Sequence, residues 1–275
     1  DAEDYAALLQ HLYPVVRGAS PGTKVVFGGL ALDWFVPDGP FDPDFLDNVL
    51  AACEGQKCFD VMNFHYYPTF RSNWESHGTA IIGKTTYVRE RLAAYDLAEK
   101  PVICTETGWD SVASWGSDEL QSRYAIKAYV RGMEADLDVV TWFWARDSEP
   151  GGGPGLLDVS RQPKDSYRAF ETMTLMLENA VYQRMLTPAE TGDERIEGYV
   201  FETGKGRMDV VWAEDGTRYV AEDDPFLSLT VEAGALRVVD KFGHETEYRD
   251  ESDGVVDGKI TVQVSGSPLF LEYGW

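Results

Sequence analysis

The chain has 275 residues, of which 44% are hydrophobic and 26% are charged, which is enough to bury the core of one large domain or two smaller ones. Its formal net charge of −23 argues, through like-charge repulsion, against nucleic acid and anionic membrane surfaces as partners; a neutral substrate fits this charge, and so does simple solubility in salt. No run of about 18 apolar residues is present, so we expect no membrane-spanning segment.

The first 180 residues alternate between helix and strand patterns. Apolar residues recur at helical spacing over residues 4–17, and a Ser-Pro-Gly sequence ends this helix. Four predicted strands follow, each a short apolar run, at residues 24–30, 59–64, 101–105 and 138–144. Each is followed by a predicted helix, and these helices begin near Asp42, Ile81, Ser117 and Asp165. Continuous apolar runs suit parallel strands that helices cover on both faces.

The pattern changes at about residue 180. Short alternating segments follow, separated by turn clusters such as Thr-Gly-Lys-Gly and Glu-Asp-Gly. The predicted strands are 197–201, 208–213, 227–231, 236–239, 259–264 and 269–273. We therefore expect two domains, an α/β domain at residues 1–179 and a small antiparallel β-sandwich at residues 180–275.

Chemistry-bearing side chains follow the four predicted parallel strands. The strand ends hold Gly29, Ala31, Asp33 and Trp34, then Asn63, His65, Tyr66 and Tyr67, then Thr105, Glu106 and Trp109, and last Trp142, Trp144, Arg146 and Asp147. Parallel barrels place their active sites at this end of the strands. Aromatic rings stack on sugar rings, and carboxylates cleave glycosidic bonds. The sequence therefore predicts a carbohydrate site here.

The order of these segments resembles a known family. Residues 101–109, PVICTETGW, resemble the strand-7 nucleophile segment of the (β/α)8 glycoside hydrolases that hold their two catalytic glutamates on strands 4 and 7. Residues 59–68 look like strand 6 of that family, and residues 140–144 are similar to strand 8 with its tryptophan platform. Residues 164–170 resemble the opening of helix 8, and residues 266–272 the last strand of the following β-sandwich.

The resemblance implies a fold and a set of roles. The fold is α/β, the second half (strands 5 to 8) of a (β/α)8 barrel followed by a β-sandwich. Glu106 would be the nucleophile of a retaining, double-displacement hydrolase of β-linked glycosides. His65 and Tyr67 would line the subsite at the cleaved bond, with Tyr67, in preference to Tyr66, donating to the nucleophile. The expected substrate contacts further include Trp142, Trp144 and Trp109. The chemistry needs no metal or organic cofactor.

One departure from the family limits this reading. The acid/base glutamate of these enzymes lies at the end of strand 4, which would precede the helix at residues 4–17. No Asn-Glu pair lies at a suitable strand end in this sequence. We therefore expect residues 1–275 to supply only one of the two carboxylates, so that hydrolysis by this chain alone is doubtful.

Two further hypotheses follow from that departure. The chain could be a catalytically incomplete carbohydrate-binding protein that keeps the aromatic platform. It could also be a half-barrel that assembles with a second copy or with a partner supplying the other half, because free strand edges and uncovered apolar surface favour association. An extracellular location is suggested by the substrate class alone, and no signal peptide is visible in these residues.

Each candidate residue also has an ordinary structural explanation. Glu106 could be a salt-bridged carboxylate and His65 a hydrogen-bonded core histidine, although the resemblance favours a functional role for both. Trp144 could be a core or loop contact. For the weaker candidates at the strand ends, loop contacts and salt bridges are the simpler expectation; these are Asp33, Trp34, Arg146 and Asp147.

The cysteines and glycines point to no further chemistry. Cys53 and Cys58 either bridge a short loop or remain free thiols, and Cys104 is expected to be a buried apolar residue. None of the four histidines has metal-ligand spacing with another. The glycine-rich residues 151–155 lack the Lys-Ser/Thr ending of a phosphate-binding loop, so we expect a flexible rim loop.

Overall fold

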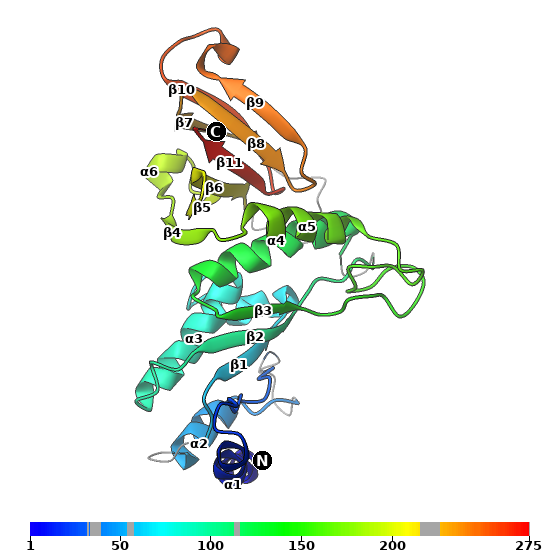
Figure 1. The fold of residues 1–275 in the computed structure, drawn as a ribbon, viewed down its shortest axis with the longest axis vertical. Helices are drawn as coiled ribbons and strands as arrows, with labels where there is room; N and C mark the ends of the chain where they lie inside the picture. The colour runs from blue at the N-terminus through cyan, green and yellow to red at the C-terminus, as the bar shows by residue number, and fades with distance from the viewer. Residues whose placement is uncertain (32, 34–39, 54–57, 113–115, 215–225, 275) are drawn as a thin grey trace. The chain divides into compact units, whose positions relative to one another are not determined.

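The computed structural model describes residues 1–31, 33, 40–53, 58–112, 116–214 and 226–274. The chain is a mixed α/β protein (Figure 1). It divides into two compact units. The first unit holds residues 1–107 and 131–143, and the second holds residues 108–130 and 144–275. The predicted domain boundary at residue 179 remains a prediction.

The first unit contains a parallel sheet of three strands in the order β1 (Met62–Tyr66), β2 (Val102–Thr107) and β3 (Val139–Trp142) (Figure 1). These strands confirm three of the four predicted apolar runs. A β-bulge between Phe64 and His65 shifts the register, so that His65 lies opposite Glu106 on β2. The bulge therefore determines which residues meet at the carboxyl end of the sheet.

The prediction of a complete strand at residues 24–30 is wrong. Among the described residues, this segment makes two isolated parallel bridges, Val26 with Val61 and Leu30 with Phe64. Between them the backbone N–H of Gly28 donates to the Tyr5 hydroxyl at 2.7 Å. A Gly-Gly pair offers no side chains to pack on a sheet, which weakens a strand at that point.

Three helices of the first unit confirm the predicted helical patterns: α1 (Ala2–Ala19), α2 (Phe45–Ala52) and α3 (Ala80–Ala94). On α1, however, the buried residues are Ala2, Ala6 and Leu9, whereas three residues of the predicted apolar pattern are largely exposed: Leu8, Leu12 and Val15. A short 3-10 helix, η1 (Pro68–Asn73), follows β1.

Two more predicted helices are confirmed. Helix α4 (Asp118–Glu134) begins after Ser117, whose Oγ accepts a hydrogen bond from the backbone N–H of Leu120 at 3.1 Å. Ser117 is therefore the N-cap of this helix. Helix α5 (Asp165–Met176) is the last helix before the antiparallel strands begin.

The second unit contains two antiparallel sheets. One has six strands in the order β4-β5-β6-β11-β8-β9, and the other pairs β10 with β7. Their bounds are β4 (Val181–Met185), β5 (Ile196–Thr203), β6 (Gly206–Ala213), β7 (Leu227–Glu232), β8 (Ala235–Asp240), β9 (Glu245–Arg249), β10 (Lys259–Val264) and β11 (Leu269–Tyr273). Two short helices accompany them, α6 (Pro188–Thr191) and η3 (Asp250–Asp253).

One apolar core lies between these sheets. It includes Val211 and Leu271 from the six-stranded sheet, and Leu229 and Val262 from the two-stranded one. All six predicted antiparallel strands are present. Two strands, β4 and β9, were not predicted, and both are mostly exposed edge strands. An edge strand that faces solvent need not show the alternating apolar pattern on which the prediction relied.

Of the two alternatives for the cysteines, the loop bridge is present. Cys53 and Cys58 form a disulfide, and Cys104 is a buried free thiol. In the part of the chain that the structure describes, no helix combines the length and the apolar character that crossing a bilayer would require.

Candidate functional site

Glu106 lies near the end of β2, and the side chains of Tyr67 and His65 approach one of its oxygens. The Tyr67 hydroxyl donates to Oε2 at 3.0 Å, and Nδ1 of His65 lies 3.2 Å from the same oxygen. Among the described residues, no hydrogen bond reaches Oε1. The side chain of Glu106 is 29% exposed. Among the described residues, the side-chain contacts of the carboxylate thus fall on one of its two oxygens.

The local backbone explains why these three side chains meet. His65 and Tyr67 are two residues apart at the end of an extended strand, so they point to the same side of the sheet. Parallel pairing with β2 then places His65 opposite Glu106. Next to them, the Asn63 Oδ1 accepts hydrogen bonds from the backbone N–H and the hydroxyl of Thr105, at 3.2 and 2.9 Å. This side-chain link supports the backbone pairing of β1 with β2 where the site begins.

His65 packs directly against the backbone of Gly29. A Cβ atom added at Gly29 would lie 1.9 Å from Nε2 of the imidazole, so the ring occupies space that only glycine leaves open. Burial lowers the pKa of His65, and this effect exceeds the opposing influence of Glu106. With Nδ1 next to a carboxylate oxygen, the Nδ1–H tautomer is the neutral form that would present a donor to Glu106.

Tyr67 and Cys104 are both held in their protonated forms. Burial and the neighbouring Glu106 raise the pKa of the Tyr67 phenol, which therefore acts as a hydrogen-bond donor at neutral pH. Burial raises the pKa of Cys104 to about 12, and its thiol lies 3.2 Å from the backbone oxygen of Glu106. Because the thiolate is the reactive form of cysteine, Cys104 is not a candidate nucleophile.

A buried ion pair lies in the same unit. Lys84 of α3 is 0% exposed, and its Nζ is 2.6 Å from Oδ1 of Asp33. Asp33 therefore forms a salt bridge, which was the simpler expectation for this residue. Lys84 was not among the predicted residues. Its spacing from Ile81 and Val88, both buried, was the available signal, because it places a lysine on the buried face of α3.

Four tryptophans were named as candidates at the ends of the predicted strands. Trp142 of β3 is 9% exposed and pairs in register with Thr107, the residue after Glu106. The second unit contains Trp109, which packs edge-on against Tyr124 at 5.5 Å, and Trp144, which is 41% exposed. A substrate contact by Trp109 or Trp144 remains a prediction. Trp34 lies outside the described residues.

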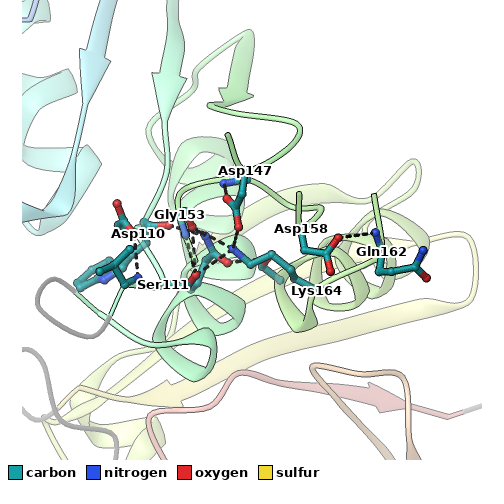
Figure 2. A network of polar contacts seen from close by, with 12 residues as sticks. Asp110, Ser111, Asp147, Gly153, Asp158, Gln162 and Lys164 are labelled. Carbon is teal, nitrogen blue, oxygen red and sulfur yellow. Dashed lines mark hydrogen bonds and ion pairs between the residues drawn. The ribbon is translucent and has the colours of Figure 1, made fainter. Parts of the chain in front are cut away.

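Asp147 is part of a polar network that joins two loops of the second unit (Figure 2). Lys164 Nζ donates to Oδ2 of Asp147, to Oγ of Ser111 and to the backbone oxygen of Gly153, each at 2.9 Å. Gln121 donates to the same Gly153 oxygen at 2.8 Å. These contacts favour a structural role for Asp147. Arg146 is exposed, and its backbone bridges to the segment near residue 157.

The glycine-rich residues 151–155 are anchored by this network. The Gly155 N–H donates to Oδ1 of Asp147 at 2.7 Å. Gly151 and Gly152 have φ angles of +100° and +107°, a backbone region that favours glycine. The loop that we expected to be a flexible rim is therefore tied at its second half to Asp147 and Lys164.

Metal-ligating clusters and cavities are the other features of the described residues that bear on ligand binding. No group of three or more His, Cys, Asp or Glu side chains suited to a metal ion occurs among the described residues. A cavity of 610 Å³ lies among the antiparallel strands of the second unit, and its lining includes Arg207, Asp209 and Tyr273 but none of the predicted site residues. The site at Glu106 rests on its side-chain geometry.

Comparison with known proteins places the fold. No family model and no curated protein matches the chain. Among solved structures, a family 39 glycoside hydrolase from the gut symbiont Bacteroides cellulosilyticus WH2 is similar, with a TM-score of 0.70 and 21% identity, over 98% of this chain and 54% of that chain. A glucosidase from Croceicoccus marinus is similar with a TM-score of 0.60 and 13% identity, over 98% of this chain and 64% of that one.

A third structure agrees with these two. A GH39 β-xylosidase from Caulobacter crescentus is similar with a TM-score of 0.55 and 17% identity, over 97% of this chain and 62% of that chain. The chain thus has a glycoside hydrolase fold and spans less than two thirds of the length of each of these structures.

Proposed function

We propose that this chain contributes the nucleophile, Glu106, of a retaining glycoside hydrolase that acts on a β-linked glycoside or polysaccharide. The main support is the arrangement at the carboxyl end of β2, where the Tyr67 hydroxyl donates to Oε2, Nδ1 of His65 lies 3.2 Å from it, and none of the described residues is hydrogen-bonded to Oε1. The glycoside hydrolase fold supports the same conclusion.

The reaction would proceed by double displacement. Oε1 of Glu106 attacks the anomeric carbon and forms a glycosyl ester as the bond to the leaving oxygen breaks. A second carboxylic acid gives that oxygen its proton, then removes a proton from the water that cleaves the ester. The two carboxyl groups of retaining enzymes lie about 5–5.5 Å apart. Trp142 would serve as the platform for the sugar ring, and Trp144 and Trp109 as further contacts.

We propose that the second carboxyl group comes from outside residues 1–275. On this view, residues 1–179 form strands 5 to 8 of a (β/α)8 barrel and residues 180–275 form the β-sandwich that follows. The similar solved structures are consistent with a partial barrel, because the chain spans only 54–64% of their lengths. The parallel strands β1 to β3 and the bridges at Val26 and Leu30 are compatible with half of such a barrel.

A partner is a further part of the proposal. Leu8, Leu12 and Val15 are 50%, 40% and 56% exposed on one face of α1. Exposed apolar side chains of this kind favour association, either with the rest of the barrel or with a second copy of the chain. A chain that binds carbohydrate without cleaving it is the competing hypothesis, and covalent labelling separates the two.

Covalent trapping tests the nucleophile directly. A 2-deoxy-2-fluoro glycoside with a dinitrophenolate leaving group needs no proton on departure, so it can react even where the acid/base group is missing. We expect a glycosyl adduct on the peptide that contains Glu106, detected by mass spectrometry and absent from Glu106→Gln. An adduct on another residue, or none in a protein that includes all eight barrel strands, would show the assignment to be wrong.

Tyr67→Phe is expected to lower kcat without displacing the nucleophile. A hydrogen bond to a charged group is worth about 1.5–3 kcal/mol, which corresponds to a loss of roughly 10- to 150-fold. The matched control is Tyr66→Phe, since the Tyr66 hydroxyl is buried and has no hydrogen-bond partner among the described residues. Equal losses of kcat for the two variants on an aryl glycoside would contradict the role of Tyr67.

A further inference from the structure

Helix α3 places a fully buried lysine beneath the segment that adjoins the candidate nucleophile. The Nζ of Lys84 donates to the backbone oxygen of Ala31 and to Oδ1 of Asp33. It also lies 4.8 Å from the centre of the Trp74 ring. A buried lysine loses its hydration, so such an ion pair gives weak support for stability compared with an apolar side chain of similar volume. Its presence calls for another explanation.

The segment that Lys84 binds is also the one that contacts His65. The His65 N–H donates to the backbone oxygen of Leu30 at 3.0 Å, and Leu30 precedes Ala31 in sequence. On the other side of Leu30, Gly29 lies directly against the imidazole, where an added Cβ would be 1.9 Å from Nε2. The imidazole thus lies between Gly29 and Glu106, with Nδ1 on the side of the carboxylate.

We propose that Lys84 is a positioning residue for the nucleophile. By binding Ala31 and Asp33, it holds the adjoining backbone of Gly29 and Leu30 against His65, and so keeps Nδ1 directed at Oε2 of Glu106. The inference rests on the proposed role of Glu106 and adds to it a residue that acts without touching the substrate.

The charges around His65 are consistent with this role. Glu106 approaches the imidazole from β2, Lys84 from α3, and the protonated Tyr67 lies two residues away on its own segment. Glu106 raises the pKa of His65, whereas the positive charge of Lys84 lowers it. Burial raises the pKa of Asp33 and lowers that of Lys84, and contact between the two opposes both shifts. Lys84 therefore favours the neutral imidazole that a single Nδ1–H donor requires.

Nitrogen NMR of labelled histidine tests the proposal on the intact protein without a substrate. The sequence has four histidines, so His65→Gln identifies the signals of His65. In the native protein we expect the Nδ1–H tautomer and a titration below the usual histidine range. In Lys84→Met, which removes the charge but keeps an unbranched side chain, we expect the two tautomers to mix and the pKa of His65 to rise.

Lys100→Met is the matched control. Lys100 also binds a backbone oxygen, that of Phe59, and lies over an aromatic ring, at the opposite end of the strand from His65. Its replacement should leave the tautomer and the titration of His65 unchanged. Native-like tautomer and titration in a folded Lys84→Met protein would overturn the proposal.

Asp33→Asn provides a second test. Asparagine still accepts a hydrogen bond from Lys84, so the Nδ1–H tautomer of His65 should persist, whereas general loosening of the site would mix the two tautomers in both variants. If Lys84→Met does not fold, mixed tautomers in Asp33→Asn are sufficient to reject the proposal. Covalent trapping at Glu106 is independent of these measurements, so a failure of either idea is distinguishable.

Discussion

Glu106→Gln is expected to lower turnover of an aryl β-glycoside by at least about 10⁴-fold, because an amide cannot form the glycosyl ester on which double displacement depends. Glutamine has nearly the same shape as glutamate, so the surrounding strands should remain folded. The measurement is kcat/KM in a protein that includes both carboxyl groups, with circular dichroism to verify folding.

The stereochemistry of a rescued variant makes this test sharper. Glu106→Ala leaves space for a small anion such as azide, which would attack the anomeric carbon from the side of the missing carboxylate. The product should then be the glycosyl azide of inverted configuration. The control is Glu171→Gln, an exposed residue of α5, which should keep native activity. Near-native turnover in Glu106→Gln would exclude Glu106 as the nucleophile.

Lys164→Met is expected to lower the free energy of unfolding of the second unit by roughly 3–5 kcal/mol, the usual cost of removing one partner from a buried ion pair. The side chains of Lys164 and Asp147 are 10% and 3% exposed, so the carboxylate would remain buried without its cation. Ser111 and the Gly153 carbonyl would lose the same donor (Figure 2). Urea denaturation measures the change.

Two further variants distinguish the effect of leaving Asp147 buried without its cation from the effect of lost side-chain packing. The double variant Lys164→Met/Asp147→Asn leaves no buried charge and should recover part of the lost stability. Lys205→Met removes an exposed lysine, 3.9 Å from Glu272, and should change the stability by less than about 1 kcal/mol. A similar loss in Lys205→Met and Lys164→Met would mean that burial of the pair is not the cause.

Much of the fold follows from the sequence because its elements show strong periodicity. Continuous apolar runs predicted parallel strands, and β1, β2 and β3 pair in that way. The Ser117 N-cap and the alternating strands after residue 180 are also present, because they too depend on the local sequence. The segment at residues 24–30 differs, because its Gly-Gly pair approaches the His65 ring instead of packing as a strand. That contact joins residues far apart in the sequence, so the local spacing of apolar residues does not reveal it.

The site was predictable in part. The strand ends and the family resemblance pointed to His65, Tyr67 and Glu106, which the structure brings together. His65 lies opposite Glu106 because of a β-bulge and the strand register, and the sequence of a single strand predicts neither of them. Lys84 was missed because a lysine is normally exposed, and its burial depends on Asp33, which is far away in sequence.

The position of Tyr67 and His65 beside one oxygen of Glu106 has a consequence for the second half of the proposed reaction. Once Oε1 is esterified, Oε2 becomes the carbonyl oxygen of the ester, with the Tyr67 hydroxyl and Nδ1 of His65 still beside it. When water cleaves the ester, the departing carboxylate regains its negative charge, part of it on Oε2. The two side chains that orient the attacking group in the first step would thus stabilise the leaving group in the second.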